Sequence, residues 1–184
     1  KRYNNIMYKK TGKNGSKLLE KIWDCNVPLL LDADALRWLA TKKIKKREGF
    51  LCGTPHMGEA FSLIGQKKRD RFEIIYELKK IYGGIWVLKG PGTMILDESL
   101  YINPFSNGIL STAGSGDVLA GIIGGLIAQK VKNPVNLGVI IHSNAARMSL
   151  ISNKKTMISS EIISNINLKY DINYDLNNKN IRFI

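Results

Sequence analysis

The 184-residue sequence predicts one domain of the α/β class, in which helices cover a largely parallel sheet. Three short runs of apolar residues, 27–31, 49–53 and 85–88, are typical of parallel strands that are buried on both faces. Segments with the apolar spacing of helices separate these runs. A glycine-rich stretch, residues 110–126, follows the last run and opens a further helix.

The first third of the chain predicts two helices around the first strand. Residues 1–16 are polar and lysine-rich and predict a loop or a frayed end. Ser16 is expected to cap a short helix, because a serine side chain accepts a hydrogen bond from the first turn. Strand 27–31 then leads into a helix over 32–40.

The middle of the chain predicts two more helices and a strand. After strand 49–53, Thr54 is expected to cap a helix with Pro55 in its first position. Residues 69–82 predict a helix that ends at Gly83-Gly84 before strand 85–88. Its predicted apolar face consists of Phe72, Ile74, Ile75, Tyr76, Leu78, Ile81 and Tyr82.

The remainder predicts a turn, a hairpin and helices. Residues 89–93 place Pro and Gly as a type II turn prefers. A hairpin is expected next, with strands 94–97 and 100–102. Helices are predicted at 135–150 and 159–168, and residues 171–184 predict a loose tail that begins rich in Asn and Asp.

The glycine-rich stretch predicts an anion site at the start of a helix. The backbone amides of Ala113, Gly114, Ser115 and Gly116 are expected to converge at the positive end of the helix dipole. Asp117 follows in the first turn, where it would lie beside a bound phosphate. Alternatively, the stretch is a capped core helix whose glycines permit close packing.

Net charge is +13, but the pattern does not indicate specific nucleic-acid binding. The lysines lie in scattered pairs, and arginine, which suits bidentate recognition of bases and phosphates, is scarce. Compositional drift toward Lys, Ile and Asn explains the charge.

The two cysteines and the hydropathy pattern predict a cytoplasmic protein. Cys25 and Cys52 have no further Cys or His at ligand spacing and are expected to be reduced thiols in the core. No apolar run approaches the roughly 20 residues that a membrane span needs. No secretory signal is visible.

Polar segments follow the predicted strands or open helices. Because ligands of such sheets bind beyond the carboxyl ends of the strands, these segments are expected to lie along one edge. They are Asp32, residues 54–56, residues 89–93 and residues 114–117.

Four ordered motifs carry a resemblance to a known family. They are 32–36 (Asp-Ala-Asp-Ala-Leu), 54–60 (Thr-Pro-His-Met-Gly-Glu-Ala), 88–93 (Leu-Lys-Gly-Pro-Gly-Thr) and 114–121 (Gly-Ser-Gly-Asp-Val-Leu-Ala-Gly). From about Ser16 to Asn165, the chain resembles the ADP/ATP-dependent NAD(P)H-hydrate dehydratases of the ribokinase-like superfamily. The resemblance implies a three-layer αβα sandwich with a largely parallel sheet, truncated here at the N-terminus.

The resemblance also implies an activity. Members dehydrate the S form of hydrated NADH and NADPH, with ADP (giving AMP) or ATP as co-substrate and Mg²⁺ as cofactor. They phosphorylate the hydroxyl on the damaged ring, and phosphate then leaves. The implied partners are these small molecules, with no nucleic acid and no membrane, and the implied assembly is a homo-oligomer.

Site residues follow from the matching positions. Asp117 would receive the hydroxyl proton and contact substrate. His56 would contact the hydrated nicotinamide, although a lone His after a strand is more often a helix-capping or structural residue. Nucleotide would bind Gly116 and the turn Lys89, Gly90, Pro91, Gly92 and Thr93. Glu59 would hold magnesium through water, although it could equally be a solvated helix charge.

Three further residues are given secondary roles. Asp32 and Asp34 are expected to line the substrate side, or Asp34 to cap a helix. His142 is expected to be structural, because its helical neighbourhood is rich in alanine.

The chain departs from the family pattern at several places. Met57 replaces the usual Pro, and Pro91 replaces a frequent Ala. Residues 6–15 stand where the family has a Gly-Pro-Gly motif that contacts substrate, and they do not match it. No epimerase domain is recognised.

Two alternatives therefore stay open: a ribokinase-like kinase for a small alcohol such as a vitamin precursor, or a nucleotide-binding remnant without turnover. His56 favours the dehydratase over the kinase, because such kinases usually carry Asn there.

Overall fold

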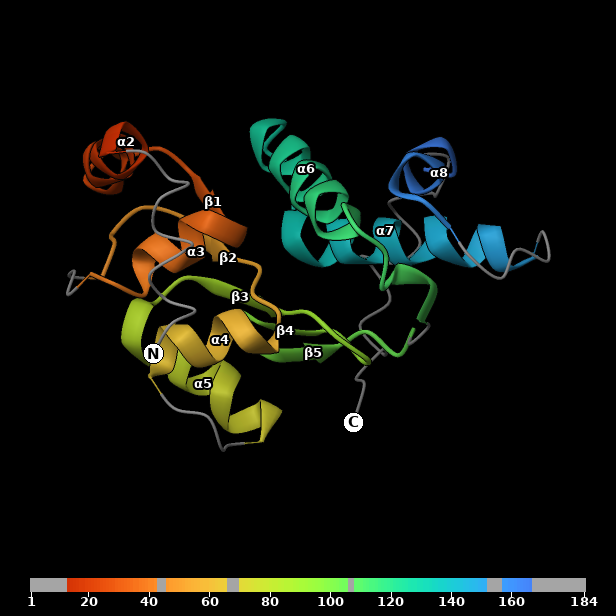
Figure 1. The fold of residues 1–184 in the computed structure, drawn as a ribbon, viewed down its shortest axis with the longest axis horizontal. Helices are drawn as coiled ribbons and strands as arrows, with labels where there is room; N and C mark the ends of the chain where they lie inside the picture. Colours follow the sequence, from red (N-terminus) through yellow and green to blue (C-terminus); the bar gives the residue numbers. More distant parts are fainter. Residues whose placement is uncertain (1–12, 43–45, 66–69, 106–107, 152–156, 167–184) are drawn as a thin grey trace. The chain divides into compact units, whose positions relative to one another are not determined.

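The computed structural model describes residues 13–42, 46–65, 70–105, 108–151 and 157–166 (Figure 1). The chain divides into two compact units, Lys1–Leu88 and Lys89–Ile184, and each unit is described by itself. The expectation of one domain over the whole chain stays a prediction. Most of segment 6–15 and the predicted tail 171–184 lie outside the described residues.

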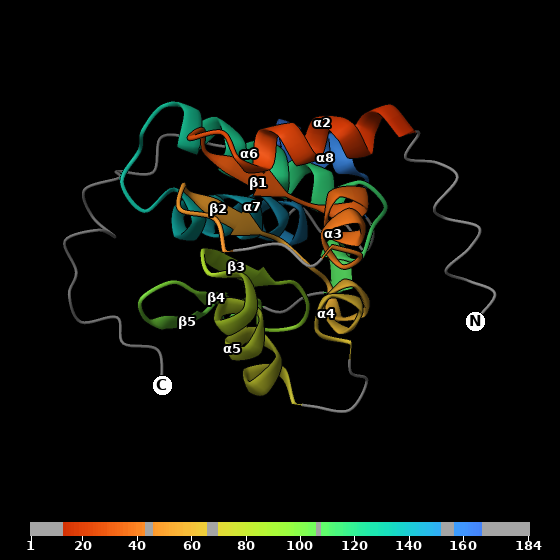
Figure 2. The same cartoon turned by 90° about the vertical axis from the view of Figure 1, so that its left-hand side faces the viewer.

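The first unit alternates helices and parallel strands. Its elements are α2 (Lys13–Trp23), β1 (Leu29–Leu31), α3 (Ala33–Leu39), β2 (Leu51–Gly53), α4 (Met57–Ile64), α5 (Arg71–Tyr82) and β3 (Ile85–Leu88). Strand β2 pairs in parallel with β1 and with β3 (Figure 2). Parallel neighbours need a crossover, and the intervening helices supply it. All three predicted strands are confirmed, although the first two are shorter than expected.

A tryptophan and a glycine fix the centre of this unit. Trp86 is fully buried on β3, and a Cβ added to Gly53 on β2 would overlap the Trp86 ring. Only glycine therefore lets the indole lie against β2. The indole Nε1–H donates to the Gly83 carbonyl oxygen at 2.7 Å.

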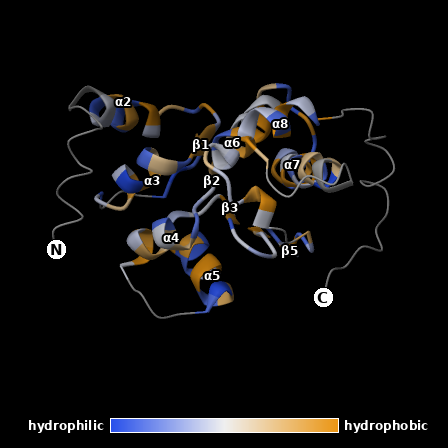
Figure 3. Cartoon of the chain, turned by 45° about the vertical axis from the view of Figure 1, so that its right-hand side comes forward, coloured by the Kyte–Doolittle hydropathy of each residue, from blue (hydrophilic) through white to orange (hydrophobic). Residues whose placement is uncertain are grey.

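Helix α5 confirms the predicted helix but corrects its buried face. Ile74, Ile75, Leu78 and Tyr82 are buried, and α5 packs against α4 and β3. Phe72 and Tyr76 are about half exposed, at 50% and 53%. Figure 3 shows apolar and polar residues on the same helix. The predicted face was too wide because a helix in this unit buries only one stripe.

Two predicted helix starts are wrong. Helix α2 already begins at Lys13, so Ser16 lies inside it, and the Ser16 Oγ accepts a hydrogen bond from Trp38 Nε1 at 3.2 Å. Thr54 does not cap α4, because its amide donates to the Leu31 carbonyl oxygen at 3.0 Å and continues the sheet. The N-cap of α4 is His56.

Two further expectations about side chains are corrected. Asp34 does not cap α3: it lies in the first turn and pairs with Arg37 at 2.5 Å, and the N-cap position belongs to Asp32. Cys52 is buried as predicted, but Cys25 is exposed and is not a core thiol. The Cys25 Sγ lies 3.2 Å from the Lys21 carbonyl oxygen, one helical turn earlier.

The second unit joins a hairpin to a helical layer. Its elements are β4 (Met94–Leu96), β5 (Leu100–Ile102), a 3₁₀ turn η1 (Gly108–Leu110), α6 (Ser115–Ala128), α7 (Pro134–Ile151) and α8 (Ser159–Ser164). Strands β4 and β5 are antiparallel, which confirms the hairpin. Helix α6 packs on α7, and α8 packs on both (Figure 1). The last helix ends at Ser164, before the expected residue 168.

The close approach of α6 and α7 depends on a glycine of α7. A Cβ on Gly138 would lie 2.5 Å from Ile123, a fully buried residue of α6. A Cβ on Gly121 or Gly125 of α6, by contrast, would meet no other element within 4 Å in the described part of the chain. Glycine at these two positions of α6 is therefore not required by close packing.

Candidate functional site

The start of α6 is a turn that favours glycine. Gly114, its N-cap, has a φ of +81°, in the left-handed region that glycine adopts without strain. A Cβ at Gly114 would also lie 3.0 Å from the Ser159 Oγ of α8. Backbone conformation and the neighbouring helix thus both favour glycine at this position.

The amides predicted to bind an anion lie around this turn, but they are not equivalent. The Ser115 amide donates to the Thr112 carbonyl oxygen at 3.2 Å. Gly116 precedes the first helical hydrogen bond, from Val118 N–H to the Gly114 carbonyl oxygen at 3.0 Å. Amides ahead of that bond lie at the positive end of the dipole. Asp117 lies in the same first turn and is exposed to solvent.

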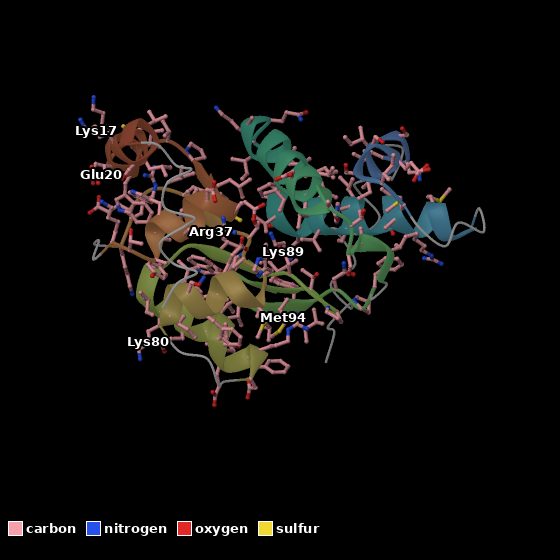
Figure 4. All side chains as sticks on the ribbon, in the orientation of Figure 1. Lys17, Glu20, Arg37, Lys80, Lys89 and Met94 are labelled. Atoms are coloured by element: carbon pink, nitrogen blue, oxygen red, sulfur yellow. The ribbon has the colours of Figure 1, made fainter. Side chains whose placement is uncertain are left out.

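One hydrogen bond within the turn over residues 89–93 and one from Asn103 fix its conformation. Gly92 has a φ of +60°, as the third residue of a type II turn requires. The Thr93 hydroxyl donates to the Gly90 carbonyl oxygen at 3.1 Å, and the Asn103 amide donates to the Thr93 carbonyl oxygen at 2.8 Å. Half-buried Lys89, labelled in Figure 4, begins the turn.

A buried histidine of α7 contacts the start of α6. His142 is 6% exposed, and its Nε2 lies 3.0 Å from the Ser115 carbonyl oxygen and 3.2 Å from the Ser115 Oγ. A carbonyl oxygen can only accept, so Nε2 carries the hydrogen. Burial lowers the pKa of His142 to about 4, the bond to the Ser115 carbonyl opposes that shift, and the positive charge of Lys89 adds to it. His142 is therefore neutral at neutral pH.

In the first unit, His56 and Glu59 form a capping box at the start of α4. The His56 amide donates to Glu59 Oε2 at 2.9 Å, and the Glu59 amide donates to His56 Nδ1 at 3.2 Å. The His56 side chain is 56% exposed, whereas that of Glu59 is 6% exposed. Because Nδ1 accepts, the hydrogen of the neutral ring is on Nε2, which lies 3.5 Å from Glu59 Oε1. The cap fixes the ring while leaving it accessible.

The described residues contain no group of three or more His, Cys, Asp and Glu side chains that could hold a metal ion. Glu59 is an oxygen donor of the kind that Mg²⁺ prefers, with one carboxylate oxygen engaged by the His56 amide. Its role with magnesium stays a prediction.

Among the helices of the described part of the chain, none has the length and apolar character to cross a membrane.

A cavity of about 850 Å³ lies in the first unit, and none of the predicted site residues lines it. Its lining includes Trp23, Trp38 and Arg47. The Arg47 guanidinium donates to the carbonyl oxygens of Ile22, Trp23, Cys25 and Val27. Arg47 therefore holds the segment between α2 and β1 in place, a role that the sequence did not indicate.

Solved structures with the same fold define the class of the protein. An ADP/ATP-dependent NAD(P)H-hydrate dehydratase from Bacillus subtilis, co-crystallized with ATP/Mg²⁺, aligns with a TM-score of 0.74 at 28% identity, over 85% of this chain and 58% of that chain. A ribokinase-like superfamily protein from Enterococcus faecalis aligns with a TM-score of 0.74 at 21% identity, over 84% of this chain and 57% of that chain. The fold is α/β and ribokinase-like, as predicted.

Sequence comparison gives the family. The model of the NAD(P)H-hydrate dehydratase family matches residues 10–168, and the chain belongs to this family. A bifunctional NAD(P)H-hydrate repair enzyme of Coxiella burnetii is 44% identical over 137 residues, 70% of this chain and 28% of that protein. An ADP-dependent (S)-NAD(P)H-hydrate dehydratase of Neisseria meningitidis is 42% identical over 114 residues, 56% of this chain and 38% of that protein. The matches thus span well under half of these relatives.

Proposed function

We propose that the chain dehydrates the S form of hydrated NADH and NADPH, with ADP (giving AMP) or ATP as co-substrate. The observation that carries this proposal is the start of α6, where the left-handed turn at Gly114 precedes the Gly116 amide and the exposed Asp117 carboxylate. Family membership supports it, since the relatives are named for this reaction.

Asp117 acts on the substrate hydroxyl in this proposal. Its carboxylate orients the hydroxyl and accepts its proton as the phosphoryl group is transferred, because such transfer depends mainly on positioning and charge stabilisation. The turn Ala113, Gly114, Ser115 and Gly116 stabilises charge on the transferring group, as oxyanion holes do. Phosphate then leaves from the phosphorylated ring, and the dihydropyridine is restored.

The nucleotide is held by the second unit. Gly116 and the turn Lys89, Gly90, Pro91, Gly92 and Thr93 bind it, with the Lys89 ammonium as the cation and the glycines allowing close approach of the backbone. His56 contacts the hydrated nicotinamide through its exposed ring, and Glu59 holds magnesium through water. Magnesium would supply charge neutralisation on the phosphates.

The binding partners, the cellular location and the oligomeric state follow from the same proposal. The partners are small molecules, and we expect neither specific nucleic-acid binding nor membrane association. A cytoplasmic location and a homo-oligomeric state are proposed with it. Light scattering of the purified chain tests the oligomer, and a monomer at micromolar concentration contradicts it.

The test combines turnover with a matched variant. The purified chain is incubated with hydrated NADH, Mg²⁺ and either ADP or ATP, and the restored NADH absorbance is followed. We expect turnover in the wild type and its loss in Asp117→Asn. Phosphorylation of the substrate without restored absorbance would indicate a kinase, and AMP binding without any phosphoryl transfer would indicate a nucleotide-binding protein.

A further inference from the structure

Helix α7 carries two adjacent buried polar residues that serve different loops. His142 and Ser143 are 6% and 5% exposed, and buried polar groups are costly unless they are hydrogen-bonded. His142 donates to the Ser115 carbonyl oxygen at the start of α6. Ser143 accepts a hydrogen bond from the Asn103 side-chain amide through its Oγ. Successive residues of a helix point about 100° apart, so one turn of α7 reaches both loops.

Asn103 continues this connection to the turn over residues 89–93. Its backbone amide donates to the Thr93 carbonyl oxygen at 2.8 Å, which closes the end of the turn. Its side-chain oxygen accepts from the Phe105 amide at 3.1 Å, so both ends of the carboxamide are engaged. Ser143 therefore acts on Thr93 through a side chain with little freedom to move.

We propose that His142 and Ser143 are positioning residues that hold the start of α6 and the 89–93 turn on one rigid helix. The inference rests on the proposed function, in which these two segments bind the phosphates and the adenylate. Both segments and both positioning residues belong to the second unit. Phosphoryl transfer depends on the relative placement of such groups, and a shift of one segment would weaken nucleotide binding without removing any contact residue.

The test uses three variants of α7. His142→Leu removes the donor to Ser115, whereas His142→Gln keeps an N–H donor at similar reach. Ile141→Val is the matched control: Ile141 is also buried, but it packs with Leu126 and Leu137. For each variant we measure the rate of amide hydrogen exchange over residues 112–118, under conditions in which all the proteins have the same free energy of unfolding. We also measure the AMP dissociation constant by calorimetry.

We expect His142→Leu to raise exchange over 112–118 and to weaken AMP binding, each by about 10-fold, the effect of one buried hydrogen bond. His142→Gln stays within about 3-fold of the wild type in both, and Ile141→Val changes neither. Unchanged exchange in His142→Leu, or no rescue by His142→Gln, overturns the inference.

Ser143→Ala tests the second connection and removes only one atom. It should raise exchange at the Asn103 amide and weaken AMP binding, and unchanged exchange there contradicts the proposal. Should His142→Leu fail to fold, Ser143→Ala still tests the proposal. A wild type that binds no adenine nucleotide refutes the proposed function, whereas the exchange measurements still test the positioning itself.

Discussion

Acid should destabilise the folded chain through His142. Burial lowers the pKa of this side chain from 6.5 to about 4, and the Lys89 ammonium, also in the second unit, opposes a positive charge on it. In the unfolded chain the imidazole has its ordinary pKa near 6.5, so the unfolded state takes up the proton first as pH falls. The stability is therefore present above about pH 6.5 and is lost as pH falls toward 4.

The magnitude follows from the shift. A difference of about 2.5 pKa units corresponds to about 3 kcal/mol of unfolding free energy, all of it lost below pH 4. At pH 5 the loss from His142 is about 2 kcal/mol relative to pH 8. Against a typical domain stability of about 5–15 kcal/mol, this is measurable.

Urea unfolding of the wild type and of His142→Gln at pH 8 and pH 5 measures the effect. Glutamine keeps a donor toward Ser115 but does not titrate, so all other ionisable groups contribute equally to both proteins. Between the two pH values the wild type should lose about 2 kcal/mol more than the variant. Equal losses would refute the reasoning, since they would mean that the histidine is protonated as readily in the folded as in the unfolded state.

Three further predictions follow from the site and the charge. Asp117→Asn should lower kcat by roughly 10²- to 10⁴-fold, as loss of a general base does, at unchanged AMP affinity and melting temperature; turnover within about 3-fold of the wild type would contradict this role. Gly114→Ala should lower the unfolding free energy by at least about 1–2 kcal/mol, because its φ is +81°, whereas the control Gly121→Ala, in open space, should not. Nucleic acid should bind only weakly, without sequence preference, and dissociate as salt rises; fluorescence anisotropy showing selective binding at physiological salt would contradict this.

The strands could be predicted because each is an uninterrupted apolar run, and burial on both faces leaves that pattern in the sequence. The start of α4 was predicted less well: the sequence placed the cap at Thr54 and gave a capping role for His56 only as the alternative to substrate contact. Threonine is a residue type favoured at N-caps, but the Thr54 amide donates to the Leu31 carbonyl oxygen. Only the pairing of β1 with β2 determines that hydrogen bond. The preference of threonine for the N-cap position was outweighed by its hydrogen bonds to Leu31, which lies 23 residues earlier in the chain.

The candidate site shows the same limit. The glycine turn at 114–116 was predictable, since few residues other than glycine permit a left-handed φ. The contact between His142 and Ser115 was not, because 27 residues separate them and helical spacing does not show which turn of α7 faces the start of α6. His142 was expected to be structural, and its hydrogen bond ties that structural role to the predicted anion turn.

The contact between Gly53 and Trp86 has a consequence for how this chain can vary. The Trp86 indole lies where any side chain at position 53 would have to be. The side-chain volume that fits at position 53 therefore depends on the size of the side chain at position 86. Gly53→Ala alone should be poorly tolerated, and Trp86→Leu alone should leave a void, yet the two together compensate in part. In related sequences, the side-chain sizes at these two positions should therefore be inversely correlated, with a small residue on one strand whenever a large ring occupies the other.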